Sequence, residues 1–425
     1  MSTRAVSRAV ATLLLAYTAP LVAQAEDPDL ARARRVLAAT PLIDGHNDLP
    51  WAIRDYAAAP RDVDAYELRG TTPGHTDIER LRRGMVGAQF WSVYIPHTYA
   101  DSGFARVQLE QIDIARRVVA KYPDHLAMAG DAADVERIFK DGKIASMLGV
   151  EGGHAIENSL GVLRLYYELG VRYMTLTHNG TLDWADAASD SARHNGLTRF
   201  GEEVVREMNR LGMLVDLSHV SPATMSDALD VSQAPVIFSH ASVRALTDHV
   251  RNVPDSILRR LPTNGGVVMV TFVPSFVSEK VRTHSQERSA VARALREQHS
   301  GDRTEVRQGL AAWDASHPAP RATIGDVADH IEHVRSVAGI DHVGIGSDFD
   351  GIEDTPEGLE DVGAFPVLFA ELARRGWSDA DLAKLAGGNL LRVMRQAEEA
   401  ARRLQRERPA STKTIEQLDG KRATD

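Results

Sequence analysis

The sequence predicts an α/β fold, a (β/α)8 TIM barrel, on two observations. Short apolar runs alternate with amphipathic segments, because strands buried on both faces are continuously hydrophobic whereas the helices that cover them have one apolar face. The apolar runs also number eight, which closes such a barrel. The predicted strands span residues 42–46, 86–94, 143–150, 171–177, 213–218, 235–239, 266–272 and 342–347.

The amphipathic segments between and after these strands predict helices. Ser221 precedes Pro222, an N-cap followed by proline at the first helical position. Ser378 and Asp381 have the spacing of a capping box. The predicted helices cover residues 26–39, 108–121, 160–169, 201–211, 324–337, 365–375 and 379–385.

One barrel domain over residues 26–395 accounts for these elements, with a C-terminal helical extension and no need for a second domain. The long gap after the seventh strand contains a charged, helix-prone insertion over 279–320. This insertion either forms part of the substrate wall or extends into solvent, and the sequence does not decide between the two. Residues 396–425 are charged and poor in large apolar side chains, so we expect a flexible tail.

Residues 1–25 have the pattern of a cleavable secretory signal. Arg4 and Arg8 form a positive start, the stretch 9–22 is mostly apolar, and a small-x-small site ends at Ala25. The alternative is a membrane anchor, but the apolar stretch is too short to span a bilayer. We therefore expect a periplasmic or secreted protein whose mature chain has no transmembrane segment.

The composition limits both the partners and the chemistry. The chain has 425 residues, 43% of them hydrophobic and 25% charged, with a net charge of −10. Since no basic stretch is concentrated enough, we expect no nucleic-acid partner. The absence of cysteine excludes disulfides and thiol nucleophiles, so any metal must bind to His, Asp or Glu side chains.

Polar side chains with metal-binding capacity follow most of the predicted strands. His46 and Asp48 lie two residues apart at the end of the first, so both side chains can reach one ion. Taken singly, each such residue is more often a core or capping side chain, but the carboxyl ends of barrel strands meet at one mouth. Three histidines and three carboxylates suffice for two divalent ions with one bridging carboxylate. The set is His46, Asp48, Glu151, His219, His240 and Asp348.

Several motifs in order resemble the membrane dipeptidase (renal dipeptidase) family, zinc peptidases related to the amidohydrolases. The resemblance covers about residues 35–395, and no single motif would be specific. The motifs are His46-Asn47-Asp48, Glu151-Gly152-Gly153, Thr177-His178-Asn179, the strands ending at His219 and His240, Arg251-Asn252-Val253-Pro254, Gly346-Ser347-Asp348-Phe349-Asp350-Gly351 and Gly388-Asn389-Leu390-Leu391-Arg392.

The resemblance implies two zinc ions in each subunit and a hydroxide shared between them. One zinc would be held by His46, Asp48 and Asp348, and the other by His219 and His240. Glu151 would bridge the two ions. Asp348 would also carry the proton from the attacking water to the leaving amine. Asp350 has the same side-chain direction in an extended run and is a weaker candidate for the ligand.

Two further residues have roles that the resemblance implies. His178 would stabilise the developing oxyanion, although it could instead only orient a ligand. Arg251 would bind the free carboxylate of a dipeptide, although it could instead be a surface arginine at a helix cap. Asp44 shares a strand face with His46 and is expected to be a buried hydrogen-bond acceptor. Four other residues are expected to border the pocket, namely Trp51, His97, Asp183 and Trp184.

The predicted function is hydrolysis of dipeptides, including those with a C-terminal D-residue. The same metals could instead serve an N-acyl amino acid deacylase or a β-lactam-opening hydrolase, and a remote alternative is a non-catalytic periplasmic zinc-binding protein. The segment Val270–Pro274 lacks a tyrosine that touches substrate in some family members, which leaves the side-chain preference open. The family also implies a possible homodimer.

Overall fold

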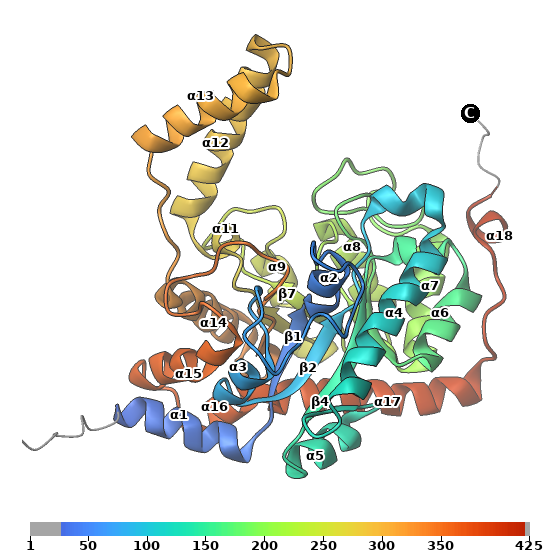
Figure 1. Ribbon diagram of the computed structural model, residues 1–425. Coiled ribbons are helices and arrows are strands. Elements are labelled where there is room, and N and C mark those ends of the chain that lie inside the picture. The colour runs from blue at the N-terminus through green and yellow to red at the C-terminus, as the bar shows by residue number, and fades with distance from the viewer. Residues whose placement is uncertain (1–26, 421–425) are drawn as a thin grey trace, which may run out of the picture.

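A computed structural model describes residues 27–420, so the predicted signal segment lies outside the described residues. A closed barrel of parallel strands forms its centre, as the sequence predicts (Figure 1). Neighbouring strands pair in the order β2-β1-β9-β8-β7-β6-β5-β4, and pairing of β2 with β4 closes the ring. The strands are β1 (Leu42–Asn47), β2 (Val86–Ser92), β4 (Ile144–Glu151), β5 (Val171–Thr175), β6 (Leu214–Asp216), β7 (Ile237–Ala241), β8 (Val267–Val270) and β9 (Val343–Ile345).

One strand was not predicted. The short strand β3 (Leu126–Met128) pairs with the beginning of β4, and three residues are too few to show a periodic pattern.

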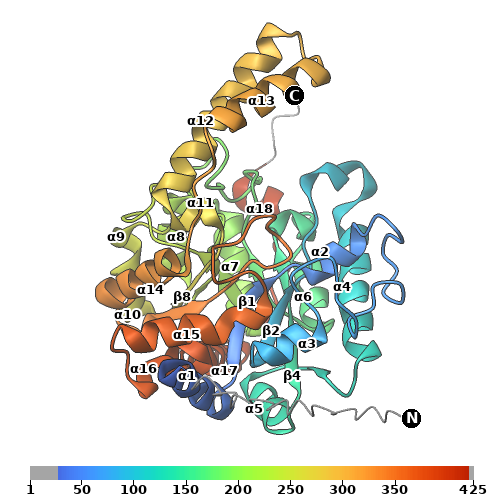
Figure 2. The ribbon, with the colours of Figure 1, turned by 60° about the vertical axis from the view of Figure 1, so that its left-hand side comes forward.

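Helices surround the barrel on its outer face (Figures 1 and 2). Ser221 and Ser378 cap helices as predicted, because each side chain accepts a hydrogen bond from the backbone three residues later. The helices around the barrel are α1 (Pro28–Ala39), α2 (Leu49–Arg54), α3 (Ile78–Arg83), α4 (Phe104–Lys121), α5 (Ala132–Lys140), α6 (Leu160–Glu168), α7 (Arg199–Leu211), α8 (Pro222–Val231), α9 (Asp255–Leu258), α10 (Leu261–Asn264), α14 (Ile324–Ala338), α15 (Phe365–Arg374) and α16 (Asp379–Ala383).

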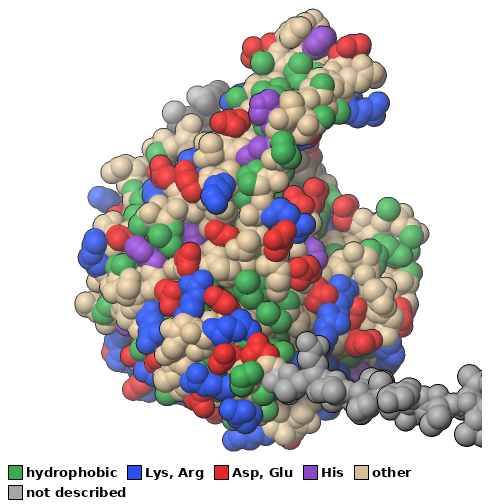
Figure 3. Space-filling model, turned by 90° about the vertical axis from the view of Figure 1, so that its left-hand side faces the viewer, with side chains coloured by type: hydrophobic (Ala, Val, Ile, Leu, Met, Phe, Trp, Pro, Cys, Tyr) green, Lys and Arg blue, Asp and Glu red, His purple; other side chains and the backbone are tan. Residues whose placement is uncertain are grey.

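The insertion after β8 forms an arm. After the short helix α11 (Pro274–Val277), helices α12 (Glu279–Gln298) and α13 (Arg303–Ser316) form a hairpin that stands clear of the barrel (Figures 1 and 3). Ala292 is the one buried residue within these two helices. No residue of 279–320 lines the central cavity described below. Val281, His284 and Arg288 of the arm instead line a neighbouring cavity, which shares Val273 and Ile352 with the central one.

The C-terminal segment differs from the expected flexible tail. Helix α17 (Asn389–Glu407) runs through residue 395 and packs against α7 and β8, and the short helix α18 (Ile415–Asp419) follows it. Ala397, Ala401 and Leu404 are buried in α17. Small alanines at helical spacing allow close packing, which a search for large apolar residues overlooks. The barrel domain therefore does not end at 395. Residues 421–425 lie outside the described part of the chain.

Closely packed side chains fill the interior of the barrel below the carboxyl ends of the strands. Phe90 packs against Tyr173 with ring centroids 5.0 Å apart, and Met269 lies so close to Gly45 that a Cβ there would approach its sulfur to 2.5 Å.

Within residues 27–420, no helix is long and apolar enough to cross a membrane.

Candidate active site

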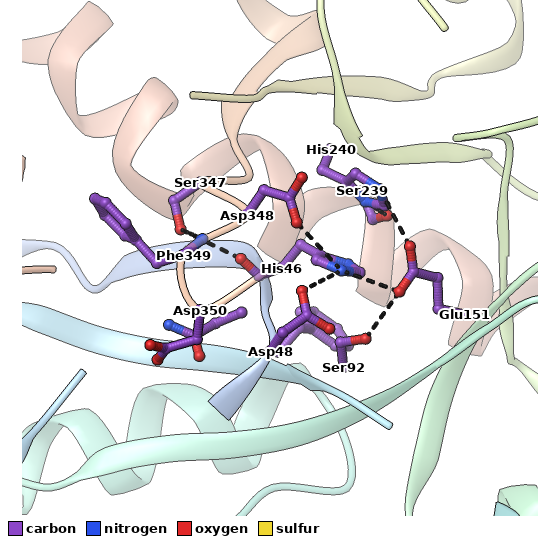
Figure 4. A network of polar contacts seen from close by, with 12 residues as sticks. His46, Asp48, Ser92, Glu151, Ser239, His240, Ser347, Asp348, Phe349 and Asp350 are labelled. Carbon is purple, nitrogen blue, oxygen red and sulfur yellow. Dashed lines mark hydrogen bonds and ion pairs between the residues drawn. The ribbon is translucent and has the colours of Figure 1, made fainter. Parts of the chain in front are cut away.

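The six predicted metal ligands converge at the carboxyl ends of the strands. Figure 4 shows this for His46, Asp48, Glu151, His240 and Asp348. His46 lies on β1 and Glu151 ends β4, whereas His240 lies on β7. Asp48, His219 and Asp348 follow β1, β6 and β9 directly or within three residues. All six are buried or nearly so, although they are charged or polar, which is unusual unless they have a common partner.

Glu151 lies at the centre of the group, and its two carboxylate oxygens face different partners. Oε1 lies 2.9 Å from Nε2 of His219 and 3.5 Å from Nε2 of His240. Oε2 lies 3.5 Å from Nε2 of His46 and accepts a hydrogen bond from Ser92 Oγ at 3.2 Å. A carboxylate in this position is suited to bridge two cations.

The second cluster of donors lies around His46. Its Nε2 is 3.2 Å from Oδ2 of Asp48 and 3.9 Å from Oδ1 of Asp348. The set His46, Asp48 and Asp348 therefore brings one nitrogen and two carboxylate oxygens to one point.

Each of the three ligand histidines has a partner on the other ring nitrogen. His46 Nδ1 lies 2.8 Å from the Tyr173 hydroxyl, and His240 Nδ1 lies 2.8 Å from Ser239 Oγ. His219 Nδ1 lies 3.2 Å from Oδ1 of Asn179. These partners fix the ring orientation, so that every Nε2 points into the cluster, which is the usual arrangement around a bound metal.

The backbone is unusual at three points of the cluster. His219 and Asp348 have φ values of 67° and 69°, which non-glycine residues rarely adopt and which occur often at functional sites. Gly152, with φ of 115°, turns the chain away after Glu151. A Cβ at Gly351 would lie 2.4 Å from Oδ2 of Asp48 and 2.6 Å from Oδ1 of Asp348, so glycine is required there.

The donor set fits divalent cations. His46 Nε2 and Asp48 Oδ1 are buried and have no hydrogen-bond partner. Burial, together with repulsion from Asp48 and Glu151, raises the pKa of Asp348 well above its usual range, although His46 opposes the shift. Bound cations stabilise buried carboxylates that lie close together and lack hydrogen-bond partners. The side chains of His, Asp and Glu are common ligands of zinc.

His178 follows β5 and faces the same cluster, with Nε2 3.7 Å from Oε1 of Glu151. Burial lowers its pKa to about 4, and the opposing charge of Glu151 does not restore it, so the imidazole is neutral at pH 7. A neutral imidazole can donate one hydrogen bond to a substrate oxygen. His178 also forms a group of possible metal ligands with Glu151 and His219. Its position is therefore compatible with a metal ligand and with a hydrogen-bond donor to the substrate oxygen.

Arg251 is not a surface residue, because its exposed fraction is 3%. Its Nη2 lies 3.0 Å from Nε2 of His240. Burial lowers its pKa to about 10, which leaves the guanidinium charged at neutral pH. A buried cation beside the ligand cluster can bind an anionic group of a substrate.

Two carboxylates predicted near the site have other partners. Asp350 is not in any of the ligand groups, because its Oδ1 accepts a hydrogen bond from the His75 backbone at 2.6 Å (Figure 4). Asp44 is the buried acceptor that we expected, with hydrogen bonds from the backbone and hydroxyl of Ser347 at 2.7 and 2.6 Å.

A cavity of about 1370 Å³ opens above the cluster. Trp51 lines it as expected, but three other residues predicted to border it do not. His97 stacks on His154, Asp183 accepts from Asn158, and Trp184 is buried against Phe200. The cavity wall also contains residues that the sequence did not single out, namely Tyr56, Tyr66, His75, Tyr94, His249 and Phe276. Tyr56, Tyr66, His75 and His249 lie in irregular segments, where no pattern indicates a side chain's direction. Tyr94 follows β2, and Phe276 lies in the four-residue helix α11.

Comparisons with known proteins agree with this site. The family model described as membrane dipeptidase (peptidase family M19) matches residues 30–408. Dipeptidase verJ of Clonostachys rogersoniana is 42% identical over 389 residues, covering 89% of each chain. Dipeptidase 3 of Mus musculus is 42% identical over 380 residues, covering 88% of this chain and 68% of its own.

A solved structure has the same fold. The probable dipeptidase PvdM from Pseudomonas aeruginosa is 25% identical, with a TM-score of 0.75 over 88% of this chain and 99% of that one. The extent of the family match and the identity to both curated relatives settle the classification. The chain belongs to the membrane dipeptidase family and is a metallopeptidase of the dipeptidase type.

Proposed function

We propose that the protein hydrolyses dipeptides at a centre of two zinc ions, using a hydroxide shared between them as the nucleophile. The observation that carries the proposal is Glu151, whose two oxygens face different histidines, His219 and His46. His46, Asp48 and Asp348 would hold one ion, and His219 and His240 the other. When bound, the two cations lower the pKa of the attacking water and polarise the scissile carbonyl.

The chain's own residues would perform three tasks around that centre. Asp348 accepts a proton from the attacking water and passes it to the leaving amine, because its carboxylate faces both the ligand cluster and the cavity. His178, neutral at pH 7, donates a hydrogen bond to the oxygen that gains charge. Arg251 binds the C-terminal carboxylate of the dipeptide through its planar guanidinium.

The position of Arg251 accounts for cleavage next to a residue with a free carboxylate. Its guanidinium lies within hydrogen-bond distance of the ligand His240, so an anchored carboxylate lies close to the metal centre. In a dipeptide, a single residue separates this carboxylate from the peptide bond, so the anchor would place that bond at the metals. The anchor selects the last peptide bond before a free carboxylate and does not by itself exclude longer peptides.

A kinetic panel with metal analysis on the same sample tests the proposal. We expect turnover of L,L-dipeptides and of L,D-dipeptides by protein that contains two zinc ions per chain. Turnover of N-acyl amino acids or of β-lactams alone would replace the dipeptidase assignment by one of the other hydrolase reactions. An inactive protein that binds zinc would indicate a zinc-binding role.

Two variants test the assigned roles. Asp348→Asn and His178→Ala should lose most of the turnover, and His178→Ala should keep both ions. Loss of one ion from His178→Ala would make His178 a metal ligand and remove its proposed role as the oxyanion donor.

We also propose that the protein is exported and cleaved after Ala25, on the pattern of residues 1–25 alone. N-terminal sequencing of protein recovered from the periplasm or medium tests this, and size-exclusion chromatography with light scattering tests the expected homodimer.

A further inference from the structure

Arg251 is a buried cation that makes no ion-pair contact with a carboxylate within the described residues 27–420, although the charges of Asp348, Glu151 and Asp216 act on it from farther away. Its Nε is buried and has no hydrogen bond. An arginine side chain is long and flexible, so contacts at the cavity wall must hold its guanidinium in one orientation. The wall next to it supplies two aromatic rings.

Phe276 of α11 lies against the guanidinium, with the Arg251 Cζ 5.2 Å from the ring centroid. His249 stacks on the same ring, with centroids 4.2 Å apart and planes inclined by 27°. His249 Nδ1 accepts a hydrogen bond from the backbone of Arg251 at 3.2 Å. Burial and the charge of Arg251 lower the pKa of His249 to about 4, so a neutral ring stacks there. We call Phe276 and His249 the arginine shelf.

Contacts between the loop after β7 and helix α11 hold the arginine shelf together. The Asn252 side chain donates hydrogen bonds to the backbone carbonyls of Phe276 and Thr247, at 2.8 and 2.9 Å. His330 of α14 joins the same two segments, because it accepts from the Val243 backbone and contacts the Val277 carbonyl, both at 3.1 Å. These bonds fix the loop after β7 against α11.

We propose that Phe276 and His249 are positioning residues that hold the Arg251 guanidinium in the orientation that receives the substrate carboxylate. This inference rests on the role proposed above for Arg251. The face of the Phe276 ring attracts the cation without neutralising it, and the remaining guanidinium edge stays available for an anion. A carboxylate partner in place of Phe276 would compete with the substrate.

The test compares four variants of the zinc-loaded full chain with L-Ala-L-Ala as substrate. The variants are Phe276→Leu, Phe276→Tyr, Arg251→Met and the double variant Arg251→Met/Phe276→Leu. Phe276→Leu should raise KM about tenfold with kcat unchanged. A tenfold change corresponds to about 1.4 kcal/mol, which is in the range of a desolvated cation–π contact. Phe276→Tyr keeps an aromatic ring beside the guanidinium and should therefore have the KM of the wild type. Zinc content and circular dichroism confirm that each variant is folded and loaded.

Phe139→Leu provides the matched control. Phe139 is a partly buried phenylalanine on α5, near the opposite end of the barrel, and its loss should leave KM unchanged. In the Arg251→Met background, Phe276→Leu should have no further effect on KM, because the cation that it positions is absent.

The possible failures are distinct. An unchanged KM for Phe276→Leu, or a rise in KM that persists in the Arg251→Met background, would overturn the shelf and leave the dipeptidase proposal intact. An unchanged KM for Arg251→Met would overturn both the carboxylate role and the shelf, while hydrolysis would stand. Absence of turnover by the wild type would overturn the proposed function and this inference together.

Discussion

Acid should weaken the fold through His330, a buried histidine whose hydrogen bonds fix its neutral form. Nδ1 accepts from the Val243 backbone, and Nε2 faces the carbonyl of Val277, both at 3.1 Å. A proton added to Nδ1 would remove the acceptor and face a backbone N–H. The side chain is 1% exposed, so water cannot solvate the charge.

The expected loss of stability follows from the difference in pKa between the folded and unfolded states. Burial lowers the pKa of His330 from 6.5 to about 4 in the folded protein. The unfolded chain therefore binds the proton first, and stability declines as the pH falls below 6.5. Each pKa unit corresponds to about 1.4 kcal/mol, so His330 alone costs about 2 kcal/mol at pH 5 and about 3 kcal/mol below pH 4.

Urea unfolding of the wild type and of His330→Gln, both with saturating zinc, measures this cost between pH 7.5 and 4. The variant lacks the titrating group, so the wild-type advantage at pH 7.5 should shrink as the pH falls. Other histidines and the metal ligands contribute equally to both proteins. A stability difference between the two proteins that is independent of pH would refute the reasoning.

Three further substitutions follow from the structure. Gly351→Ala should weaken metal binding at least tenfold, because the added Cβ would collide with two ligand carboxylates; a zinc titration measures this. Tyr173→Phe removes the hydroxyl beside a ligand histidine and should lower zinc affinity about 10- to 100-fold, measured with a competing chelator. Leu404→Ala should destabilise the protein by about 2–4 kcal/mol, since this buried leucine belongs to the unexpected part of α17; urea unfolding measures the cost.

Each substitution has a control of the same kind. Gly161→Ala, where the nearest atom would lie at 3.5 Å, should leave zinc affinity unchanged. Tyr166→Phe removes a buried hydroxyl that donates to the backbone carbonyl of Ala155 and not to a ligand side chain, so it should affect stability but not zinc affinity. Wild-type stability of Leu404→Ala, or wild-type zinc affinity of Gly351→Ala or Tyr173→Phe, would contradict the corresponding argument.

The barrel strands and the ligand cluster were predictable for a common reason. Strands buried on both faces must be apolar throughout, so polar residues at their ends stand out, and the parallel topology brings those ends together. His46 and Glu151 could be identified in this way. Residues in irregular loops could not, because no periodicity relates sequence to direction there. His249, in such a loop, and Phe276, in the four-residue helix α11, therefore escaped notice. Asp350 was the weaker candidate for the ligand, and the structure shows that its carboxylate accepts a hydrogen bond from the His75 backbone.

The sequence by itself determined the barrel, the rim on which the ligands lie, and their chemical type, because these depend on hydrophobic pattern and on the chemistry of single side chains. Only the tertiary structure decided which oxygen of Glu151 faces which histidine, that Arg251 is buried beside His240, and that no residue of 279–320 lines the central cavity. These features depend on contacts between loops distant in sequence. The packing of α17 through its small alanines also became evident only from the tertiary structure. Close packing depends on the surface of the partner elements as well as on the helix itself.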